Sequence, residues 1–125
     1  MASADGGLAR RAAFDIGSGA TKLMVADVSG TACEKVLFGQ EIPVAFAIAW
    51  KASADGTLSE EIRTKGLEAL RQLLAVCDSH GVPANARRAV ATEVFRKAAN
   101  GADYLAQVHR ELGLAVEVVT QDVEA

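Results

Sequence analysis

A short polar segment between two apolar runs carries several groups that bind anions. The segment reads DIGSGATK, and its glycines, Gly17 and Gly19, let backbone amides approach a ligand closely. Ser18 and Thr21 add hydroxyl donors, and Lys22 adds a positive charge. These five residues predict a turn that binds phosphate groups, whereas an ordinary hairpin with a glycine-rich turn is an equally good interpretation of the segment alone.

The same segment begins with a carboxylate, Asp15, at the end of the first apolar run. A carboxylate in this position can hold a magnesium ion directly or through water, as phosphate sites require. The spacing of the glycines differs from the P-loop pattern GxxxxGK[ST] and from the dinucleotide pattern GxGxxG. Neither of the phosphate motifs that begin a helix therefore applies.

Charged residues follow two later apolar runs. The segment ATEVFRKAANG places Arg96 shortly after a predicted strand, with Glu93 nearby, and a planar guanidinium suits bidentate phosphate binding. The final segment EVVTQDVEA places Asp122 and Glu124 after another strand, where a carboxylate can orient and deprotonate water. A surface arginine and solvated acids are the alternatives. Because loops at one edge of an open α/β sheet converge, the three clusters together predict one anion site.

Alternating or continuous apolar patterns predict the strands that position these clusters. Residues 1–11 have no apolar signal-peptide core and are predicted to be a disordered lead-in, and the domain occupies residues 12–125. The doublets Arg10-Arg11 and Arg87-Arg88 are interpreted as residues at the beginnings of strands. The predicted strands are 12–16, 22–28, 33–40, 89–91 and 114–119, with 44–50 as a continuation of the third strand or an extra one.

Capping residues and apolar spacing predict two helices. The first begins at Ser59, or at Thr57 with Glu60 as a capping box, and ends at Gly81. The second covers residues 102–112 and ends at Gly113. This order predicts an α/β fold with a mixed five-stranded sheet and flanking helices. No predicted helix follows the last strand to cover its face of the sheet, so we expect the chain to be part of something larger.

Composition excludes several classes of function. The chain has 125 residues, 50% hydrophobic and 23% charged, with a net charge of −3. Its mixed charges argue against a nucleic-acid surface, and no apolar run is long enough to span a bilayer. Cys33 and Cys77 are isolated and match no zinc or disulfide pattern. Two unpaired cysteines fit a reducing compartment, which predicts a cytoplasmic protein.

The segment FDIGSGATKLMVADV resembles the first phosphate loop of the superfamily of actin, sugar kinases and heat-shock chaperones. The helix LSEEIRTKGLEALRQL and the segment ATEVFRKAANGADYLAQVHRELGLAVEVVTQDVEA narrow the resemblance to the Ppx/GppA family of exopolyphosphatases and guanosine pentaphosphate phosphohydrolases. It implies a ribonuclease-H-like (actin-like ATPase) half-domain of a two-lobed enzyme. It also implies magnesium-dependent hydrolysis of terminal phosphoanhydrides in polyphosphate or guanosine pentaphosphate, and a homodimer when full length.

The resemblance assigns roles to individual residues. Glu124 matches the carboxylate that activates water, Arg96 matches the arginine of ATxxxR, and Asp15, Gly17 and Ser18 match the start of the family loop DxGSNS. The chain differs from the family pattern after Ser18, before Glu124, where it reads TQDV, and in GQEIPVAFAIAW, which lacks the usual arginine.

The second phosphate loop of the family, DxGGGS, lies beyond the last residue. Phosphoryl transfer needs charge stabilisation from both sides of the phosphate, so the chain alone is expected to be inactive. Two other hypotheses stay open. One is part of an ATP-dependent kinase or activator ATPase of the same superfamily, which the SGATK sequence favours, and the other is a module that binds phosphate compounds without turnover.

Overall fold

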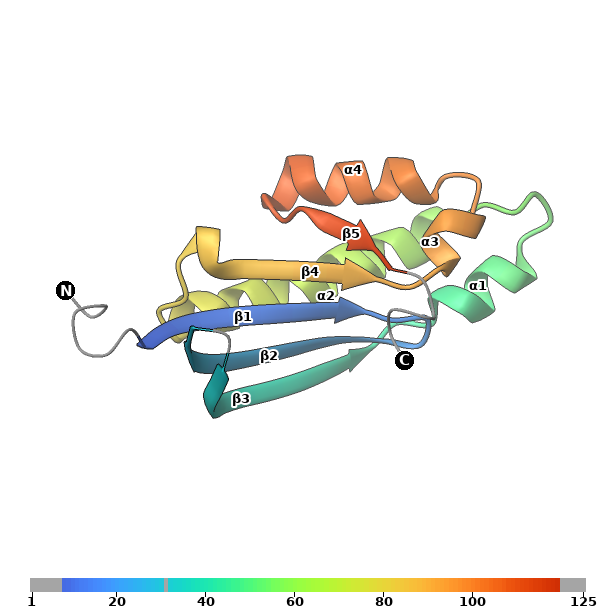
Figure 1. Cartoon of the computed structure of the whole chain (residues 1–125). Coiled ribbons are helices and arrows are strands. Elements are labelled where there is room, and N and C mark those ends of the chain that lie inside the picture. The colour runs from blue at the N-terminus through green and yellow to red at the C-terminus, as the bar shows by residue number, and fades with distance from the viewer. Residues whose placement is uncertain (1–7, 31, 120–125) are drawn as a thin grey trace.

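Three antiparallel strands begin the fold (Figure 1), which we describe from a computed structural model for residues 8–30 and 32–119. They are β1 (Leu8–Ile16), β2 (Ala20–Ser29) and β3 (Ala32–Pro43). In β1 the side chains of Ala12, Phe14 and Ile16 are buried, whereas the intervening ones are exposed. This alternation is typical of a strand with one face on a core and the other face uncovered.

Two parallel strands complete the sheet. Strand β4 (Arg87–Ala91) pairs with β1, and β5 (Val116–Val118) pairs with β4. The strand order is β3-β2-β1-β4-β5, so β1 lies at the centre. The prediction of a mixed five-stranded sheet is confirmed.

Helices connect the later strands. Helix α2 (Glu60–Ser79) is capped by Ser59, whose Oγ accepts a hydrogen bond from the amide of Ile62 at 3.3 Å. Helix α4 (Gly101–Leu112) ends at Gly113, which takes a left-handed conformation with φ of 70°. Both predicted helices are therefore confirmed, including the cap and the terminating glycine. The short helices α3 (Val94–Lys97) and η2 (Ala84–Ala86) complete these connections.

The prediction of a strand over residues 44–50 is wrong, because this segment forms helix α1 (Phe46–Ala52). The amides of Val44 and Ala47 donate to the carbonyl oxygens of Gly19 and Ser18, which turns the chain out of β3 after Pro43. Phe46 is then fully buried among aromatic rings, 4.8 Å from Phe95 between ring centroids. A short apolar run does not distinguish a buried strand from a short buried helix.

The predicted lead-in over residues 1–11 is also too long, because β1 begins at Leu8. Residues 8–11 pair with β2 from Ser29 back to Ala26, and these backbone hydrogen bonds hold them in the sheet. Residues 1–7 lie outside the described residues.

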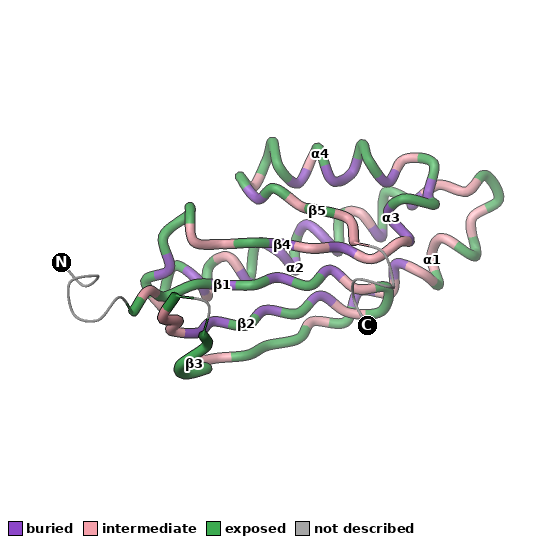
Figure 2. Tube along the Cα trace, in the orientation of Figure 1, coloured by how far each residue is buried: buried purple, intermediate pink, exposed green. Residues whose placement is uncertain are grey.

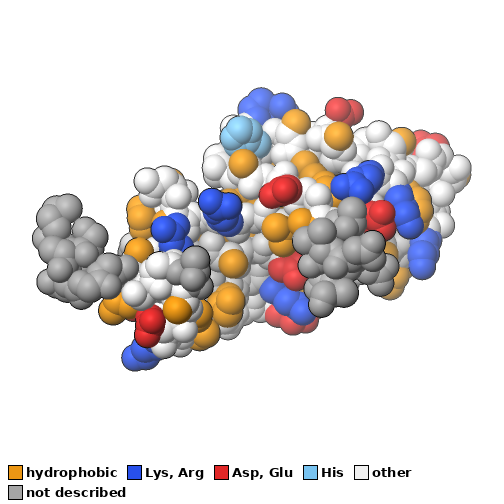
Figure 3. Space-filling model, viewed as in Figure 1, with side chains coloured by type: hydrophobic (Ala, Val, Ile, Leu, Met, Phe, Trp, Pro, Cys, Tyr) orange, Lys and Arg blue, Asp and Glu red, His pale blue; other side chains and the backbone are white. Residues whose placement is uncertain are grey.

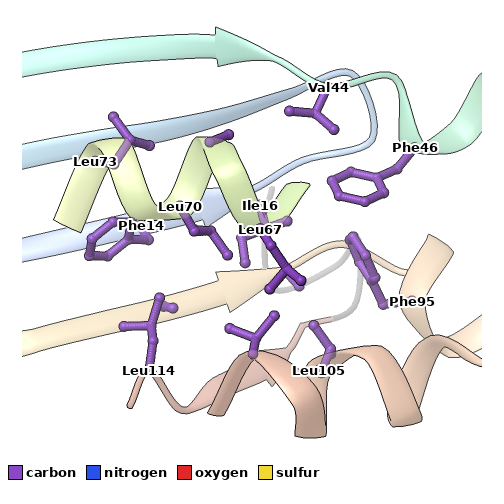
Figure 4. Close-up of a cluster of buried hydrophobic side chains, with 14 of the residues drawn as sticks. Phe14, Ile16, Val44, Phe46, Leu67, Leu70, Leu73, Phe95, Leu105 and Leu114 are labelled. Atoms are coloured by element: carbon purple, nitrogen blue, oxygen red, sulfur yellow. The ribbon is translucent and has the colours of Figure 1, made fainter. Parts of the chain in front are cut away.

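The core lies between one face of the sheet and the helices (Figure 4). Phe14 and Ile16 from β1 meet Leu70 and Leu73 from α2, and Leu105 from α4 closes the cluster. Exposed residues alternate with buried ones along β1 and much of β2, and most residues of β3 are exposed or half-buried (Figure 2). No helix covers the opposite face of the sheet in the part of the chain that the structure describes (Figure 1). In the same described part, no helix combines the length and hydropathy that a membrane span needs.

Candidate functional site at the carboxyl ends of the parallel strands

The three parallel strands end in the same register. Ile16 of β1 lies beside Ala91 of β4, which lies beside Val118 of β5. The next amides continue the ladder, since Thr92 N donates to Ile16 O at 3.2 Å and Val119 N donates to Ala91 O at 2.9 Å. The segments that follow β1 and β4, and the residue that follows β5, therefore begin at one edge of the sheet, as the sequence predicts.

The turn between β1 and β2 consists of residues 17–19. The amide of Gly17 donates to Ala20 O at 2.9 Å and closes the turn. Ser18 and Gly19 are exposed, and their carbonyl oxygens accept hydrogen bonds from Ala47 N at 2.9 Å and Val44 N at 3.1 Å. The turn is thus fixed against the beginning of α1.

Two backbone donors of this turn are available to a ligand. Within the described residues, the amides of Ser18 and Gly19 and the hydroxyl of Ser18 have no hydrogen-bond partner. Neither Gly17 nor Gly19 takes a left-handed conformation. A Cβ at Gly17 would lie 3.0 Å from Ala20 O, whereas a Cβ at Gly19 would meet nothing within 4 Å. Glycine at 17 therefore permits the tight turn, and glycine at 19 leaves open space beside the free amides.

Thr21, which the sequence predicts to add a hydroxyl donor to the turn, is buried. Its side chain is 1% exposed, on the face of β2 that packs on the core, opposite Ile16 of β1. Its Oγ1 has no hydrogen-bond partner among the described residues. Thr21 faces the core because side chains alternate between the two faces of β2, and Leu23 and Val25, two and four residues later, also face the core.

Asp15 and Lys22 lie opposite each other on neighbouring strands. Both are exposed on the face of the sheet that no described helix covers, next to Glu41 of β3. They adjoin the turn from the side of the sheet, whereas Ser18 and Gly19 form its tip. Together these residues place one carboxylate, one ammonium group and two free amides around the end of the β1–β2 hairpin.

Arg96 is exposed on α3, the short helix that follows β4. It lines a groove of about 590 Å³ between α4 and β5, together with His109 and Val118. Its guanidinium forms no hydrogen bond or ion pair with any residue that the structure describes. The structure brings Arg96 to the same edge of the sheet as the turn but shows no contact between them. Glu93 lies at the beginning of α3 and is half-buried.

Thr92 is a residue of this edge that the sequence analysis did not select. It follows β4 directly, and its Oγ1 is buried without a partner among the described residues. Its position immediately after a predicted strand, where ligand contacts concentrate in open sheets, was the pattern that could have identified it.

The remaining predicted acids, Asp122 and Glu124, lie outside the described residues. Within the described ranges, no three His, Cys, Asp or Glu side chains cluster to hold a metal ion. Asp15 alone still fits magnesium, because this ion usually keeps several waters and takes one or two carboxylates together with substrate phosphates.

Comparison with known proteins decides the family. The family model described as the Ppx/GppA phosphatase family matches residues 24–125. The chain belongs to the Ppx/GppA phosphatase family. The crystal structure of the Aquifex aeolicus family member is 29% identical and superimposes with a TM-score of 0.82, covering 94% of this chain and 37% of that one.

More distant structures share the fold. An exopolyphosphatase from Cytophaga hutchinsonii is 21% identical with a TM-score of 0.75, over 89% of this chain and 34% of that chain. A chain of the PilM–PilN type IV pilus biogenesis complex is 13% identical with a TM-score of 0.56, over 89% and 35%. The ribonuclease-H-like, actin-like ATPase fold expected of this Ppx/GppA chain is thereby confirmed. The chain spans just over a third of the length of the Ppx/GppA structures that it matches.

Proposed function

We propose that this chain forms one side of the phosphate site of a phosphohydrolase that cleaves terminal phosphoanhydrides in inorganic polyphosphate or guanosine pentaphosphate. Membership in the Ppx/GppA phosphatase family supports a phosphohydrolase of that family. The observation that carries the proposal for this chain is the turn at 17–19, where the exposed Ser18 and Gly19 have amides without a partner among the described residues, at the edge where the parallel strands end.

Each group at this edge has a chemical part in the proposal. The free amides and hydroxyl of Ser18 and Gly19 bind phosphate oxygens, and Lys22 adds positive charge. Asp15 holds magnesium, which neutralises phosphate charge when it is bound. Arg96 clamps the scissile phosphate, and Glu124 orients and deprotonates the attacking water. The described residues supply one side of the phosphate, so we expect little or no turnover by these 125 residues alone.

Binding by the 125-residue chain tests the phosphate site directly. Titration calorimetry with magnesium tripolyphosphate measures the affinity of the wild-type chain and of Arg96→Ala and Ser18→Ala. Because a charged hydrogen bond to phosphate is lost, Arg96→Ala should weaken binding at least about tenfold. Lys97→Ala removes the neighbouring exposed cation of the same short helix and should leave the affinity nearly unchanged. Equal weakening by both variants would reduce Arg96 to a general surface charge.

Turnover tests the roles that need the longer protein. Phosphate release from polyphosphate and from guanosine pentaphosphate is measured with a full-length protein that contains these residues. Glu124→Gln should abolish release while tripolyphosphate still binds, and Asp122→Asn tests the other predicted carboxylate of the same segment and should retain release. Comparable activity in Glu124→Gln would remove Glu124 from the mechanism. Phosphate transfer to an acceptor, or hydrolysis of ATP alone, would assign the protein to the kinase and activator ATPase alternative.

A further inference from the structure

Arg96 stands on a helix that is too short to hold its own position. Helix α3 has four residues, and isolated helices this short are unstable in water. Its residues Val94 and Phe95 are buried, and the ring of Phe95 lies edge-on to that of Phe46 (Figure 4). Burial of apolar surface is not directional. The direction in which α3 presents Arg96 therefore depends on other, directed bonds.

Such bonds come from the connection between α3 and α4. Asn100 Oδ1 accepts a hydrogen bond from Leu58 N at 2.8 Å, and Asn100 Nδ2 donates to Leu58 O at 3.0 Å, across 42 residues of sequence. The neighbouring amide of Ala99 donates to Gly56 O at 2.8 Å. The side-chain amide of Asn100 thus uses both its donor and its acceptor on one backbone unit, which fixes its orientation.

The segment that Asn100 binds, residues 56–58, is itself joined to α1. Gly56 O accepts a second hydrogen bond, from Trp50 Nε1 of α1, at 3.2 Å. The beginning of α1 is bonded to the turn at 17–19, as described above. Directed hydrogen bonds therefore connect the turn to α1, α1 to residues 56–58, and that segment to Asn100.

The chain between Asn100 and α3 is short and tightly packed. Gly101, the first residue of α4, lies so close to α3 that a Cβ there would collide with Phe95 O. The amide of Gly101 donates to Ala98 O at 3.0 Å, and Tyr104 N donates to Asn100 O at 3.0 Å. A displacement of Asn100 is therefore passed on to the backbone of α3.

We infer that Asn100 is a positioning residue that sets the place of Arg96 relative to the turn at 17–19. The inference rests on the proposed function for its chemical purpose, which is the binding of phosphate by both groups. Lysine and arginine side chains gather at the end of the molecule where α1 and α3 lie (Figure 3), and positive charge of this kind attracts anions. A guanidinium binds phosphate through directed hydrogen bonds, so a change in the direction of α3 costs affinity at unchanged charge.

The place of Arg96 can be measured without any phosphate compound. Spin labels are attached to the variants Ser18→Cys and Arg96→Cys in one chain, which also carries Cys33→Ser because Cys33 is exposed. Cys77 is fully buried and stays. Pulsed electron paramagnetic resonance then gives the distribution of the distance between the two labels.

Asn100→Leu removes both hydrogen bonds to Leu58 and adds no charge, so the distance distribution should shift or broaden. Val82→Ala is the matched control. It removes buried core volume near the beginning of β4, away from the site, and should leave the distribution unchanged. Circular dichroism checks that each variant is folded. Where Asn100→Leu does not fold, Asn100→Asp keeps the acceptor for Leu58 N, and the label distance is measured in that variant.

Titration calorimetry with magnesium tripolyphosphate measures the consequence for binding. Asn100→Leu should weaken binding at least about threefold, and no more than Arg96→Ala does. The double variant Asn100→Leu/Arg96→Ala should bind as Arg96→Ala alone does, because an effect that acts through Arg96 disappears with it. Val82→Ala should bind as the wild type does.

Three results would overturn the inference. The first is an unchanged label distance in a folded Asn100 variant, and the second is a shifted distance with unchanged affinity. The third is a double variant in which the two losses multiply, which would assign Asn100 a structural role independent of Arg96. A wild-type chain that binds no tripolyphosphate would contradict the proposed function instead, and the label distance would still decide whether Asn100 positions Arg96.

Discussion

Thr21 shows how the position of a single hydroxyl determines its role. A hydroxyl that is buried without a partner costs free energy, because it has lost its hydrogen bonds to water. We expect Thr21→Val to raise the free energy of unfolding by about 1 kcal/mol, since valine has the same shape and no polar atom. Chemical denaturation measures the change, and Thr64→Val, at an exposed position of α2, should change stability little.

The same variant tests whether Thr21 binds phosphate. If the Thr21 hydroxyl does not contact phosphate, the affinity of Thr21→Val for magnesium tripolyphosphate should equal that of the wild type. A loss of affinity with unchanged stability would return Thr21 to the phosphate site that the sequence analysis predicted.

Asp55 predicts how stability depends on pH. Its carboxylate accepts hydrogen bonds from Thr57 Oγ1 at 2.6 Å, Ser53 Oγ at 2.8 Å and Thr57 N at 3.2 Å. These bonds, that from the Thr57 hydroxyl first, lower the pKa of Asp55 from 3.8 to about 2. The folded state therefore binds this proton less readily than the unfolded state, and the stabilisation is complete above about pH 4.

We therefore expect the free energy of unfolding to fall as the pH decreases from about 4 towards 2, as Asp55 becomes protonated. Urea unfolding at several pH values measures this loss in the wild type and in Asp55→Asn. The variant has no charge to titrate at this position, so its stability should fall less over the same interval. Identical pH profiles would show that other acids cause the loss.

At the scale of elements, Gly66 allows α2 to pack closely against the aromatic cluster. A Cβ at this position would lie 2.6 Å from Phe46 Cζ and would also collide with the Tyr104 hydroxyl. We expect Gly66→Ala to lower the free energy of unfolding by about 1–3 kcal/mol, although alanine favours helices, because overpacking outweighs helix propensity here.

Thermal unfolding followed by circular dichroism measures this change. Gly19→Ala is its control, because the Cβ would meet nothing within 4 Å and the fold should be unaffected. A Gly66→Ala variant as stable as the wild type would mean that Phe46 and Tyr104 can move away at little cost.

Sequence patterns correctly predicted those helices and strands in which the capping residues and the apolar spacing indicate the same structure. The apolar run at 12–16 and Gly113 each indicate one structure, which the structure confirms, and of the two predicted caps of the first helix it confirms Ser59. The apolar run at 44–50 was wrongly predicted to be a strand. It forms a helix because of hydrogen bonds to the distant turn at 17–19 and because Phe46 is buried. Long-range contacts of this kind are not contained in local spacing.

The candidate site was predicted only in part, for a related reason. The convergence of the strand ends follows from the order of the elements, so the edge was predicted correctly. The inward position of Thr21 depends on the register between β1 and β2, and the place of Arg96 depends on how α3 packs. Those details are set by tertiary structure.

At the scale of the whole molecule, the sheet predicts a gradient of local stability. β1 is paired on both sides, whereas β5 has three residues and one described neighbour. In amide hydrogen exchange we expect the amides of β1 to exchange most slowly and those of β5 to exchange faster by at least about tenfold. Equal protection would show that a further segment or partner covers the outer edge of β5.

The contact between the turn and α1 also has a thermodynamic consequence. The amide of Ala47 donates to Ser18 O, which fixes the turn to α1. The residue before Ala47 is Phe46, and its ring packs on Phe95. Phe95 belongs to α3, the short helix that also carries Arg96. The backbones of the turn and of α3 thus stand on one support, and a phosphate compound that binds here does not have to order them. The entropic cost of binding then comes mainly from the exposed side chain of Arg96, whose rotamers must be fixed.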